Sequence, residues 1–412
     1  MSEWKKVKLG ELYEVHNGLS KGREFFGSGY PFLTFSTVFN NWFLPKELDS
    51  LVQSSDKERD ACSIRKGDVF ITRTSETMNE LGMSSVALRD YPNATYNGFT
   101  KRLRPITDNV VPEYIGYYLR SPKFRGKFMT FSTMTTRASL ANGDLLGMEV
   151  ELPNKEIQKQ IAQILFRYDS LIENYQRQIK LLEESAQRLY KEWFVDLNYP
   201  NHESDKIIDG VPEGWEKKKL SEIAYLKAGG DKPDIVSETK NLDCPIPIFS
   251  NGTSNEGLYG YTNKPDIREH SVTISARGSV GYTALRRKPF VPIIRLIAVV
   301  PKEIYVGYLY YYLKNTKFIS NGAAQQQITI PMIRDMEIPI PPLNTLGSFK
   351  NIVEPRFSHI DKLKEQVNFL NEARDRLLPK LMSGEINVET AQSVTSGLRV
   401  RKVQTGSPQA SD

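Results

Sequence analysis

A narrow apolar stripe runs through the middle of the chain, from residue 161 to residue 193. Its members recur at alternating intervals of four and three residues: Ile161, Leu165, Tyr168, Ile172, Tyr175, Ile179, Leu182, Ala186, Leu189 and Trp193. A 3.5-residue period sustained over several heptads is typical of a coiled-coil seam. Asn154 can cap the start of this helix, and Pro200 follows its end. The pattern predicts a helix of about 40 residues, or about 60 Å at 1.5 Å per residue.

A second stripe with a similar period lies near the C-terminus. Its members are Phe349, Val353, Phe357, Ile360, Leu363, Val367, Leu370, Leu377 and Leu381. A shift of 188 residues lays Ile172 on Ile360 without a gap, although Arg374 falls on the apolar Ala186. Pro355 is expected to kink the second helix or delay its start. Because helices this long cannot bury a narrow stripe alone, we expect them to pair as an antiparallel coiled coil rather than to be ordinary core helices.

The segments that precede the two stripes also repeat. Residues 4–9 and 215–220 share a Trp, a basic run and a Leu at a shift of 211. The two shifts differ by 23 residues, which predicts an insertion in the first copy, within the loop-rich residues 40–80. Each copy reads as short β-rich runs followed by a Tyr-rich helix. The fold class is therefore predicted to be α+β, with two tandem heads on a helical frame.

These patterns divide the chain into five parts. The first head is expected at residues 1–153 and the first long helix at residues 154–200. The second head is expected at residues 201–341 and the second long helix at residues 342–390. Residues 391–412 are polar and small, which predicts a disordered tail.

Composition excludes several classes of protein. Of the 412 residues, 39% are hydrophobic and 25% are charged, which is typical of a globular chain. No apolar run reaches the roughly 18 residues of a membrane helix, and the first residues lack the apolar core of a signal peptide. Cys62 and Cys244 fall in different heads, which excludes a disulfide framework and favours a cytoplasmic location.

Basic residues gather in matching places in the two copies. Residues 100–137 contain eight basic and two acidic side chains, and residues 268–318 contain nine basic and two acidic ones. The helical residues 154–200 are neutral, with seven of each sign. Two basic segments on a neutral connector predict two faces that bind a polyanion, although solvated surface without a partner is the alternative.

Polar side chains in or beside these segments are candidates for contacting nucleic acid. Arg can fork onto guanine, and Gln can pair with adenine. In the first copy the candidates are Arg73, Thr74, Lys101, Arg102, Thr135 and Arg137. In the second copy they are Arg277, Ser279, Arg295, Gln325, Gln326 and Gln327. Each copy places an Arg just past a β-rich run, but any one of these residues could instead stabilise a turn.

The sequence predicts neither a catalytic centre nor a metal site. It has no G-x-x-x-x-G-K-[ST] loop for a nucleotide phosphate. The four histidines are scattered without the spacing of metal ligands.

The chain resembles the specificity subunits of Type I restriction-modification systems over nearly its whole length. The resemblance depends on four segments: Trp4 with residues 9–11 and Gly18; residues 152–161; residues 189–220, with Trp193, Phe194, Pro200, Gly214 and Trp215; and residues 377–386. One departure is Ser348, which stands where the first copy has Gln160 at the entry to the helix. With Pro355, it puts in doubt whether both helix starts bind partners equally well.

The resemblance implies a non-catalytic subunit with two target recognition domains, each reading one half of a bipartite, asymmetric site in double-stranded DNA. It also implies two conserved helices that hold these domains apart. The expected partners are two methyltransferase subunits, which use S-adenosylmethionine, and two ATP-driven restriction subunits, so those cofactors and magnesium are expected in the partners. The candidates for binding a partner subunit are Ile161, Leu165, Ile172, Trp193, Phe194, Ile360 and Val367.

Two other functions fit the same residues less well. An enzyme that acts alone on DNA would need an active site that the sequence does not reveal. A scaffold with basic faces that reads no specific DNA would need only the charge pattern.

Overall fold

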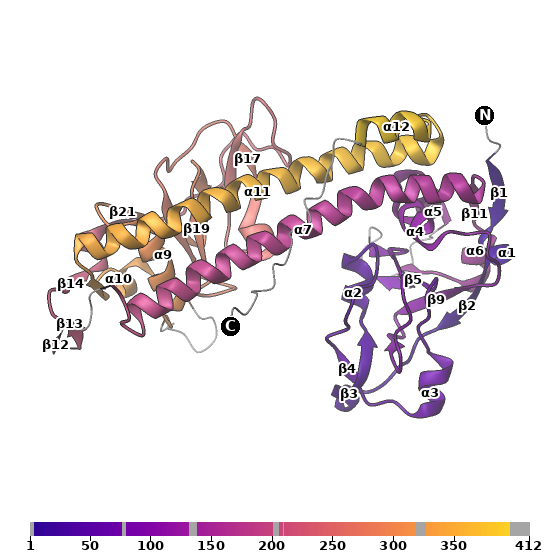
Figure 1. Ribbon diagram of the computed structural model, residues 1–412, viewed down its shortest axis with the longest axis horizontal. Helices are drawn as coiled ribbons and strands as arrows, with labels where there is room; N and C mark the ends of the chain where they lie inside the picture. Colours follow the sequence, from indigo (N-terminus) through magenta and orange to yellow (C-terminus); the bar gives the residue numbers. More distant parts are fainter. Residues whose placement is uncertain are drawn as a thin grey trace, which may run out of the picture. The chain divides into compact units, whose positions relative to one another are not determined.

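The computed structural model describes residues 4–75, 80–131, 138–200, 206–208, 210–318 and 327–395 (Figure 1). The chain forms two compact units. Unit 1 comprises Met1–Tyr175 and Glu365–Asp412, and unit 2 comprises Gln176–Lys364. Each unit therefore contains one head and half of each long helix. Head 1 denotes the part of unit 1 before residue 154, and head 2 denotes residues 206–341.

The two long helices are α7 (Lys155–Phe194) and α11 (Leu343–Ser383). Within unit 1, Asp169 of α7 forms an ion pair with Arg374 of α11. Within unit 2, Glu183 of α7 lies near Lys364 of α11. Partner numbers in α11 fall as those in α7 rise, so the helices run antiparallel, as Figure 1 shows. The predicted antiparallel coiled coil is confirmed.

Pro355 does not delay α11. The helix begins at Leu343, well before the proline, and continues to Ser383. Pro355 is exposed, so the carbonyl that loses its N–H partner can be hydrated. The predicted delay is therefore wrong.

Head 1 is built on two small sheets. The four-stranded antiparallel sheet has the order β2 (Tyr13–Asn17), β9 (Thr100–Pro105), β5 (Val69–Thr72) and β7 (Ser84–Val86). The three-stranded sheet has the order β4 (Leu51–Val52), β3 (Phe26–Leu33) and β8 (Thr95–Tyr96). Two further antiparallel pairs are β1 (Lys5–Lys8) with β11 (Glu149–Leu152), and β6 (Thr74–Ser75) with β10 (Ala138–Ser139).

Head 2 repeats the two sheets and the outer strand pair of head 1. Its four-stranded sheet has the order β15 (Ala224–Ala228), β21 (Leu296–Pro301), β18 (Ser271–Ser275) and β19 (Thr283–Arg286). Its three-stranded sheet has the order β17 (Leu258–Thr262), β16 (Ile246–Phe249) and β20 (Val291–Pro292). The outer pair is β14 (Glu216–Lys219) with β22 (Glu337–Ile340), and a small hairpin joins β12 (Ile207–Ile208) to β13 (Val211–Pro212). The predicted duplication and the α+β class are confirmed.

The length difference between the heads does not come from one insertion. The sheet registers equate Val15 with Leu226, Val69 with Val272, Leu103 with Val299 and Val150 with Ile338. The shift therefore falls from 211 to 203, then to 196, and finally to 188. Part of the excess lies before β5, as predicted, but the rest is spread over the connections between β5 and β11. The prediction of a single insertion within residues 40–80 is therefore wrong.

Short helices connect the strands and cover the sheets. In unit 1 they are α1 (Leu9–Leu12), η1 (Arg23–Phe25), α2 (Phe35–Asn40), α3 (Asp56–Ala61), α4 (Pro112–Arg120), α5 (Pro122–Phe131), α6 (Asn142–Gly147) and α12 (Val388–Thr395). In unit 2 they are α8 (Leu220–Ile223), η4 (Ser254–Gly257), α9 (Val306–Asn315) and α10 (Ile330–Ile333). The tail predicted from residue 391 begins inside α12, and residues 396–412 lie outside the described part. No helix of the described residues combines the length and apolarity needed to span a bilayer.

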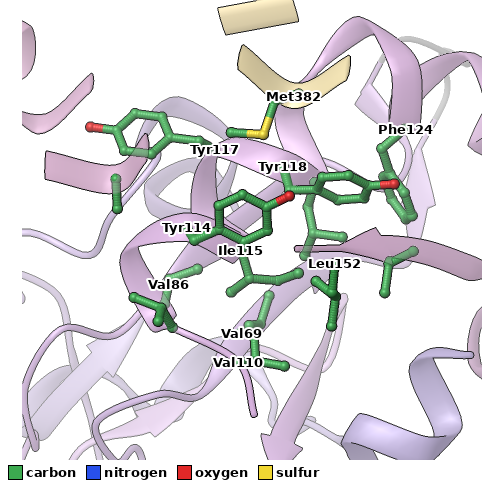
Figure 2. Packing of buried hydrophobic residues seen from close by; sticks show 14 of the residues in the cluster. Val69, Val86, Val110, Tyr114, Ile115, Tyr117, Tyr118, Phe124, Leu152 and Met382 are labelled. Atoms are coloured by element: carbon green, nitrogen blue, oxygen red, sulfur yellow. The ribbon is translucent and has the colours of Figure 1, made fainter. Parts of the chain in front are cut away.

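The Tyr-rich helix joins each head to the long helices of its own unit. In unit 1, Tyr114, Tyr117 and Tyr118 of α4 are fully buried in a core that includes Met382 of α11 (Figure 2). The Tyr114 hydroxyl donates to the Glu151 carbonyl at 3.2 Å, which satisfies its polar atom inside the core. In unit 2, the equivalent helix α9 packs against α7 and α11 in the same way. The tyrosines thus extend each sheet core into the helix seam.

A close backbone approach recurs in both heads. Gly18 follows β2, and a Cβ there would overlap the carbonyl oxygen of Asn97. Gly229 follows β15, and a Cβ there would overlap the carbonyl oxygen of Ile293. The two glycines are 211 residues apart, so the duplicated frame retains the one residue type that fits.

The helix seam differs between the units at one pair of equivalent positions. In unit 1, Arg374 Nη1 donates to Asp169 Oδ1 at 2.7 Å, and the Tyr117 hydroxyl donates to Oδ2 of the same carboxylate. The 188-residue shift between the copies places Phe357 at the position of Asp169 and Ala186 at the position of Arg374. Both Phe357 and Ala186 are buried in the apolar core of unit 2. The unit 1 seam therefore contains a charged pair where the unit 2 seam is apolar.

We predict that Arg374→Ala selectively loosens unit 1. The change leaves the Asp169 carboxylate, whose side chain is 22% exposed, without its cation, and such losses cost about 3 kcal/mol. Hydrogen exchange of residues 165–175 should be faster, whereas Arg376→Ala, on the same helix but 83% exposed, should leave it unchanged. Leucines at both positions 169 and 374 should restore most of the protection. Equal exchange in the wild type and Arg374→Ala would contradict the assigned role.

Candidate nucleic-acid interface

The candidate residues of head 1 gather at one end of its four-stranded sheet. Arg73 follows β5 and is half-buried, and its Nη1 donates to Asn17 Oδ1 at 3.3 Å, at the end of β2. Lys101, in β9, is 5% exposed, and its ammonium donates to Asn142 Oδ1. Burial, together with the charge of Arg73, lowers the pKa of Lys101. The structure thus brings Arg73 and Lys101 together, but Lys101 is largely covered.

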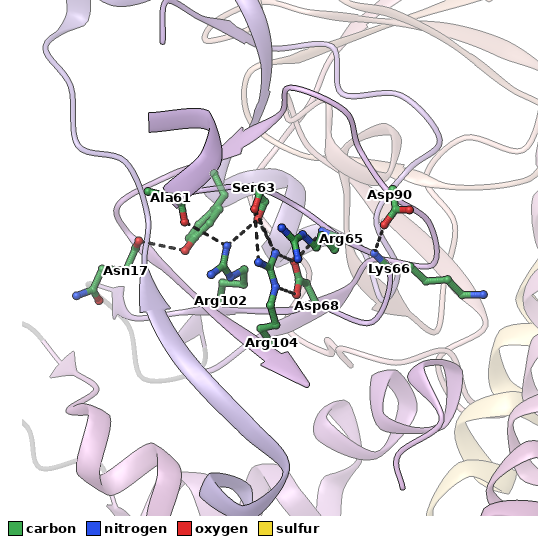
Figure 3. Close-up of polar contacts among 10 residues, drawn as sticks. Asn17, Ala61, Ser63, Arg65, Lys66, Asp68, Asp90, Arg102 and Arg104 are labelled. Carbon is green, nitrogen blue, oxygen red and sulfur yellow. Dashed lines mark hydrogen bonds and ion pairs between the residues drawn. The ribbon is translucent and has the colours of Figure 1, made fainter. Parts of the chain in front are cut away.

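Arg102 lies inside head 1. Its side chain is 3% exposed, and its Nη1 donates to the carbonyl oxygens of Ser63 at 2.7 Å and Ala61 at 3.3 Å (Figure 3). The neighbouring Arg104 forms a bidentate pair with the buried Asp68, at 2.9 and 2.7 Å. Both arginines therefore hold the segment around residues 61–68 against β9. Arg102 is not placed to contact DNA, and its prediction is corrected on this ground.

Further arginines counted in the two basic segments also serve the fold. Arg120 donates to the carbonyl oxygens of Ser84 and of the C-terminal end of α2, and burial lowers its pKa to about 10. Arg286 is 4% exposed in head 2, and burial likewise lowers its pKa to about 10. Arg287 pairs with Glu354 and Asp361. The charge available to a ligand is therefore smaller than the sequence count suggests.

The candidates of head 2 lie at the equivalent end of its four-stranded sheet. Arg277 is the second residue after β18 and donates through Nε and Nη2 to Gln327 Oε1, at 2.8 and 2.5 Å. Ser279 is exposed in the next turn. Arg295 is exposed just before β21 and has a left-handed backbone, with φ of 72°. The structure thus brings Arg277 and Gln327 into direct contact.

The two arginines that follow β5 and β18 are not equivalent. The sheet registers make Thr72 and Ser275 the matching last residues of these strands. The next residue is Arg73 in head 1 and Ala276 in head 2, so Arg277 corresponds to Thr74. Each arginine follows a strand, as predicted, but the two lie one position apart in the shared register, which is enough to point a side chain to the other face of a strand.

Few described groups suggest reactive chemistry. No group of three or more His, Cys, Asp or Glu side chains in the described ranges could hold a metal ion. Cys62 and Cys244 are buried and free, and burial raises the pKa of the Cys62 thiol.

Comparison with known proteins identifies the family. A family model described as the Type I restriction modification DNA specificity domain matches residues 1–184 and 212–368. The chain belongs to this family. It is 29% identical to the Type I restriction enzyme MjaIX specificity subunit of Methanocaldococcus jannaschii, over 94% of each chain. It is 24% identical to the HindI specificity subunit of Haemophilus influenzae, over 94% of this chain and all of that one.

A solved structure shares the fold. The S subunit of a Type I restriction-modification system from M. genitalium superposes with a TM-score of 0.57 at 17% identity, covering 92% of this chain and 96% of that chain. The resemblance seen in the sequence is thus confirmed, and the chain is a specificity subunit rather than an enzyme of such a system.

Several predicted DNA-binding residues of this specificity subunit cannot be placed. Thr135, Arg137, Gln325 and Gln326 lie outside the described residues, and only the backbone of Thr74 is described. Their assignment stays a prediction.

The predicted partner-binding residues mostly lie within the chain itself. Six of them are buried in the core of their own unit: Ile161, Leu165, Ile172, Trp193, Phe194 and Ile360. The seventh, Val367, is partly buried. The 3.5-residue stripe thus marks the internal seam, which leaves these six side chains unavailable to another subunit. That part of the prediction is corrected.

Other apolar residues of the long helices are exposed. They are Phe166 and Phe369 in unit 1, and Leu181, Leu343 and Ile352 in unit 2. The sequence signal that could have identified them is an apolar residue that lies on a long helix but outside its stripe.

We predict that Arg73→Ala weakens DNA binding by the specificity subunit. Affinity falls as salt concentration rises, and loss of one phosphate contact should make the slope of log affinity against log salt shallower by about 0.9. Lys66→Ala, an exposed residue of the same head, should leave the slope unchanged. Duplex titrations at several salt concentrations, with the subunit in complex with its partners, provide the measurement. An identical slope for wild type and Arg73→Ala would remove Arg73 from the interface.

Proposed function

We propose that this specificity subunit reads a bipartite, asymmetric DNA site, with each head reading one half. The observation that carries the proposal is the matching strand end in the two heads. The backbone there is equivalent, but head 1 presents Arg73 and Thr74 where head 2 has Ala276 and Arg277. Equivalent frames with different polar side chains would place two similar modules on DNA and give each a different preference.

We further propose that the long helices support two methyltransferase subunits together with restriction subunits. Each unit has a cleft between the start of its Tyr-rich helix and the first turns of a long helix. The cleft of unit 1 has a volume of about 530 Å³ and is lined by Val111, Lys159 and Phe166. The cleft of unit 2 has a volume of about 520 Å³ and is lined by Tyr305, Leu343 and Gly347. Two clefts at equivalent places suit two copies of one partner, and an exposed apolar residue in each supports this assignment.

Cofactors belong to the partners in this proposal. S-adenosylmethionine, ATP and magnesium would be bound by the methyltransferase and restriction subunits, in the cytoplasm. This chain would contribute recognition and assembly.

A scaffold with basic faces that does not read specific DNA is the second candidate. The internal roles of Arg102, Arg104, Arg120 and Arg286 favour it, because they reduce the charge that faces outward. The two candidate functions differ in whether the subunit distinguishes one DNA sequence from another. A scaffold would bind random duplex as tightly as any particular sequence.

The deciding experiment is sequencing of methylated adenines in a host that expresses the complete system and has no other adenine methylation. We expect one split motif, with two unlike halves separated by a spacer of unspecified bases. A system without the specificity subunit is the control and should leave the genome unmethylated. Methylation without any motif, or at an uninterrupted one, would contradict the proposed function.

A further inference from the structure

The contact between Arg277 and Gln327 has an unusual donor pattern. Two N–H groups on one side of the guanidinium, Nε and Nη2, donate to a single amide oxygen at 2.8 and 2.5 Å. Nη1 makes no hydrogen bond with any described residue. Arg has five N–H donors in a rigid plane. The contact therefore fixes the plane through one edge. The end formed by Nη1 and the second N–H of Nη2 has no acceptor among the residues that the structure describes.

The backbone beneath Arg277 is held firmly. Asn251 Nδ2 donates to the Arg277 carbonyl at 2.8 Å, and the Ser275 hydroxyl donates to the Asn251 carbonyl at 3.2 Å. Gly278 follows with φ of 73°, and a Cβ there would lie 2.9 Å from Asn251 Nδ2. The turn after β18 therefore has little freedom, so the direction of the Arg277 side chain depends mainly on Gln327.

Gln327 is itself anchored to the head 2 core. The next residue, Ile328, is 1% exposed, and its N–H donates to the Ala276 carbonyl at 3.0 Å. The segments that carry Arg277 and Gln327 are thus joined through their backbones as well as their side chains. This doubled connection orients the guanidinium before any ligand arrives, which lowers the entropic cost of binding.

The chemistry of the partner matters as well. Gln327 contributes a neutral oxygen, so the guanidinium keeps its positive charge undiminished, unlike that of Arg104, which faces Asp68. The free end presents two parallel N–H groups with a positive charge. Two acceptors on one planar edge match it, and the major-groove edge of guanine offers them as O6 and N7.

Head 1 has different chemistry at the same place. The strand registers equate Arg277 with Thr74. The Leu140 N–H donates to the Arg73 carbonyl as the Ile328 N–H donates to the Ala276 carbonyl, which equates Gln327 with Ser139. Thr74 and Ser139 are partners in the register of β6 and β10. The shared backbone thus carries an arginine and an amide in one head and two short hydroxyl residues in the other. A ligand preference that depends on this pair can exist only in the half-site of head 2.

We propose that Arg277 reads a guanine in the half-site of head 2 and that Gln327 is a positioning residue, which aims the guanidinium at that base. The proposal rests on the proposed function, because it requires that this end of the sheet faces the major groove. It goes further by assigning one base to one side chain.

The test compares variants of the complete system by sequencing methylated adenines in the host. Arg277→Lys keeps the charge but loses the fork, so methylation should relax at a single guanine of one half-site. Discrimination at that base should fall about tenfold to a hundredfold. Gln327→Leu removes the oxygen that orients the guanidinium, and it should relax the same base by a smaller factor. Arg334→Ala, an exposed arginine of head 2, is the matched control and should leave the motif unchanged.

The other half of the motif is an internal control, since no variant touches head 1. If Arg277→Lys leaves the motif intact, or Arg277→Ala lowers occupancy equally at every site, the residue contacts a phosphate and the inference fails. Relaxation at a different base with Gln327→Leu would show that Gln327 reads DNA itself. Changes in both halves would indicate a general structural role, which also overturns the assignment. A wild-type system without a split motif would refute the proposed function instead, so the two failures can be told apart.

Discussion

The pairing of α7 with α11 is the contact on which the rest of the specificity subunit depends. Each helix has a long apolar stripe that it cannot bury alone, and each unit buries half of both stripes beside its own head. The Tyr-rich helices α4 and α9 continue the same cores into the sheets. A head, half of each long helix and one tyrosine cluster therefore form one packing unit, and the chain contains this unit twice.

The two copies share one backbone frame but differ in side chains at particular positions. Gly18 and Gly229 retain the same close approach, and the strand order is the same in both heads. The seam has Asp169 and Arg374 in one unit but Phe357 and Ala186 at the equivalent positions of the other. A partly buried charged pair tolerates few alternative partners, so this difference favours pairing of α7 with α11 over pairing of either helix with a copy of itself. The turn after β5 and β18 differs in a second way, in the side chains offered to a ligand.

The sequence predicted the frame well because its signals are local and periodic. The stripes predicted the long helices and their antiparallel pairing. The repeated β-rich runs and Tyr-rich helices predicted the two α+β heads. The register of the strands was harder, because the loops between them differ in length at several points. The sequence therefore did not show that Arg73 and Arg277 lie one position apart in the shared frame. Whether an arginine is buried in the fold or available to a ligand could not be predicted, because this depends on carbonyl groups that are remote in the sequence. Arg102, for example, donates a hydrogen bond to the carbonyl of Ser63, 39 residues away.

The long stripe also shows how one pattern can carry two interpretations. Its residues were expected to bind a partner subunit, yet most are buried within their own unit. An apolar stripe reports that a surface is covered, without reporting what covers it. The exposed apolar residues outside the stripe, such as Phe166 and Leu343, are better candidates for an intermolecular contact.

The central claim is that one duplicated frame holds two heads that read DNA independently. The most direct test replaces residues 224–335 by the corresponding residues of the 29% identical relative from Methanocaldococcus jannaschii, while α7 and α11 remain unchanged. Methylated adenines are then sequenced in a host that expresses the chimera with its partner subunits. The account predicts a split motif in which one half is retained and the other is replaced. A motif that changes in both halves, or in neither, would contradict it.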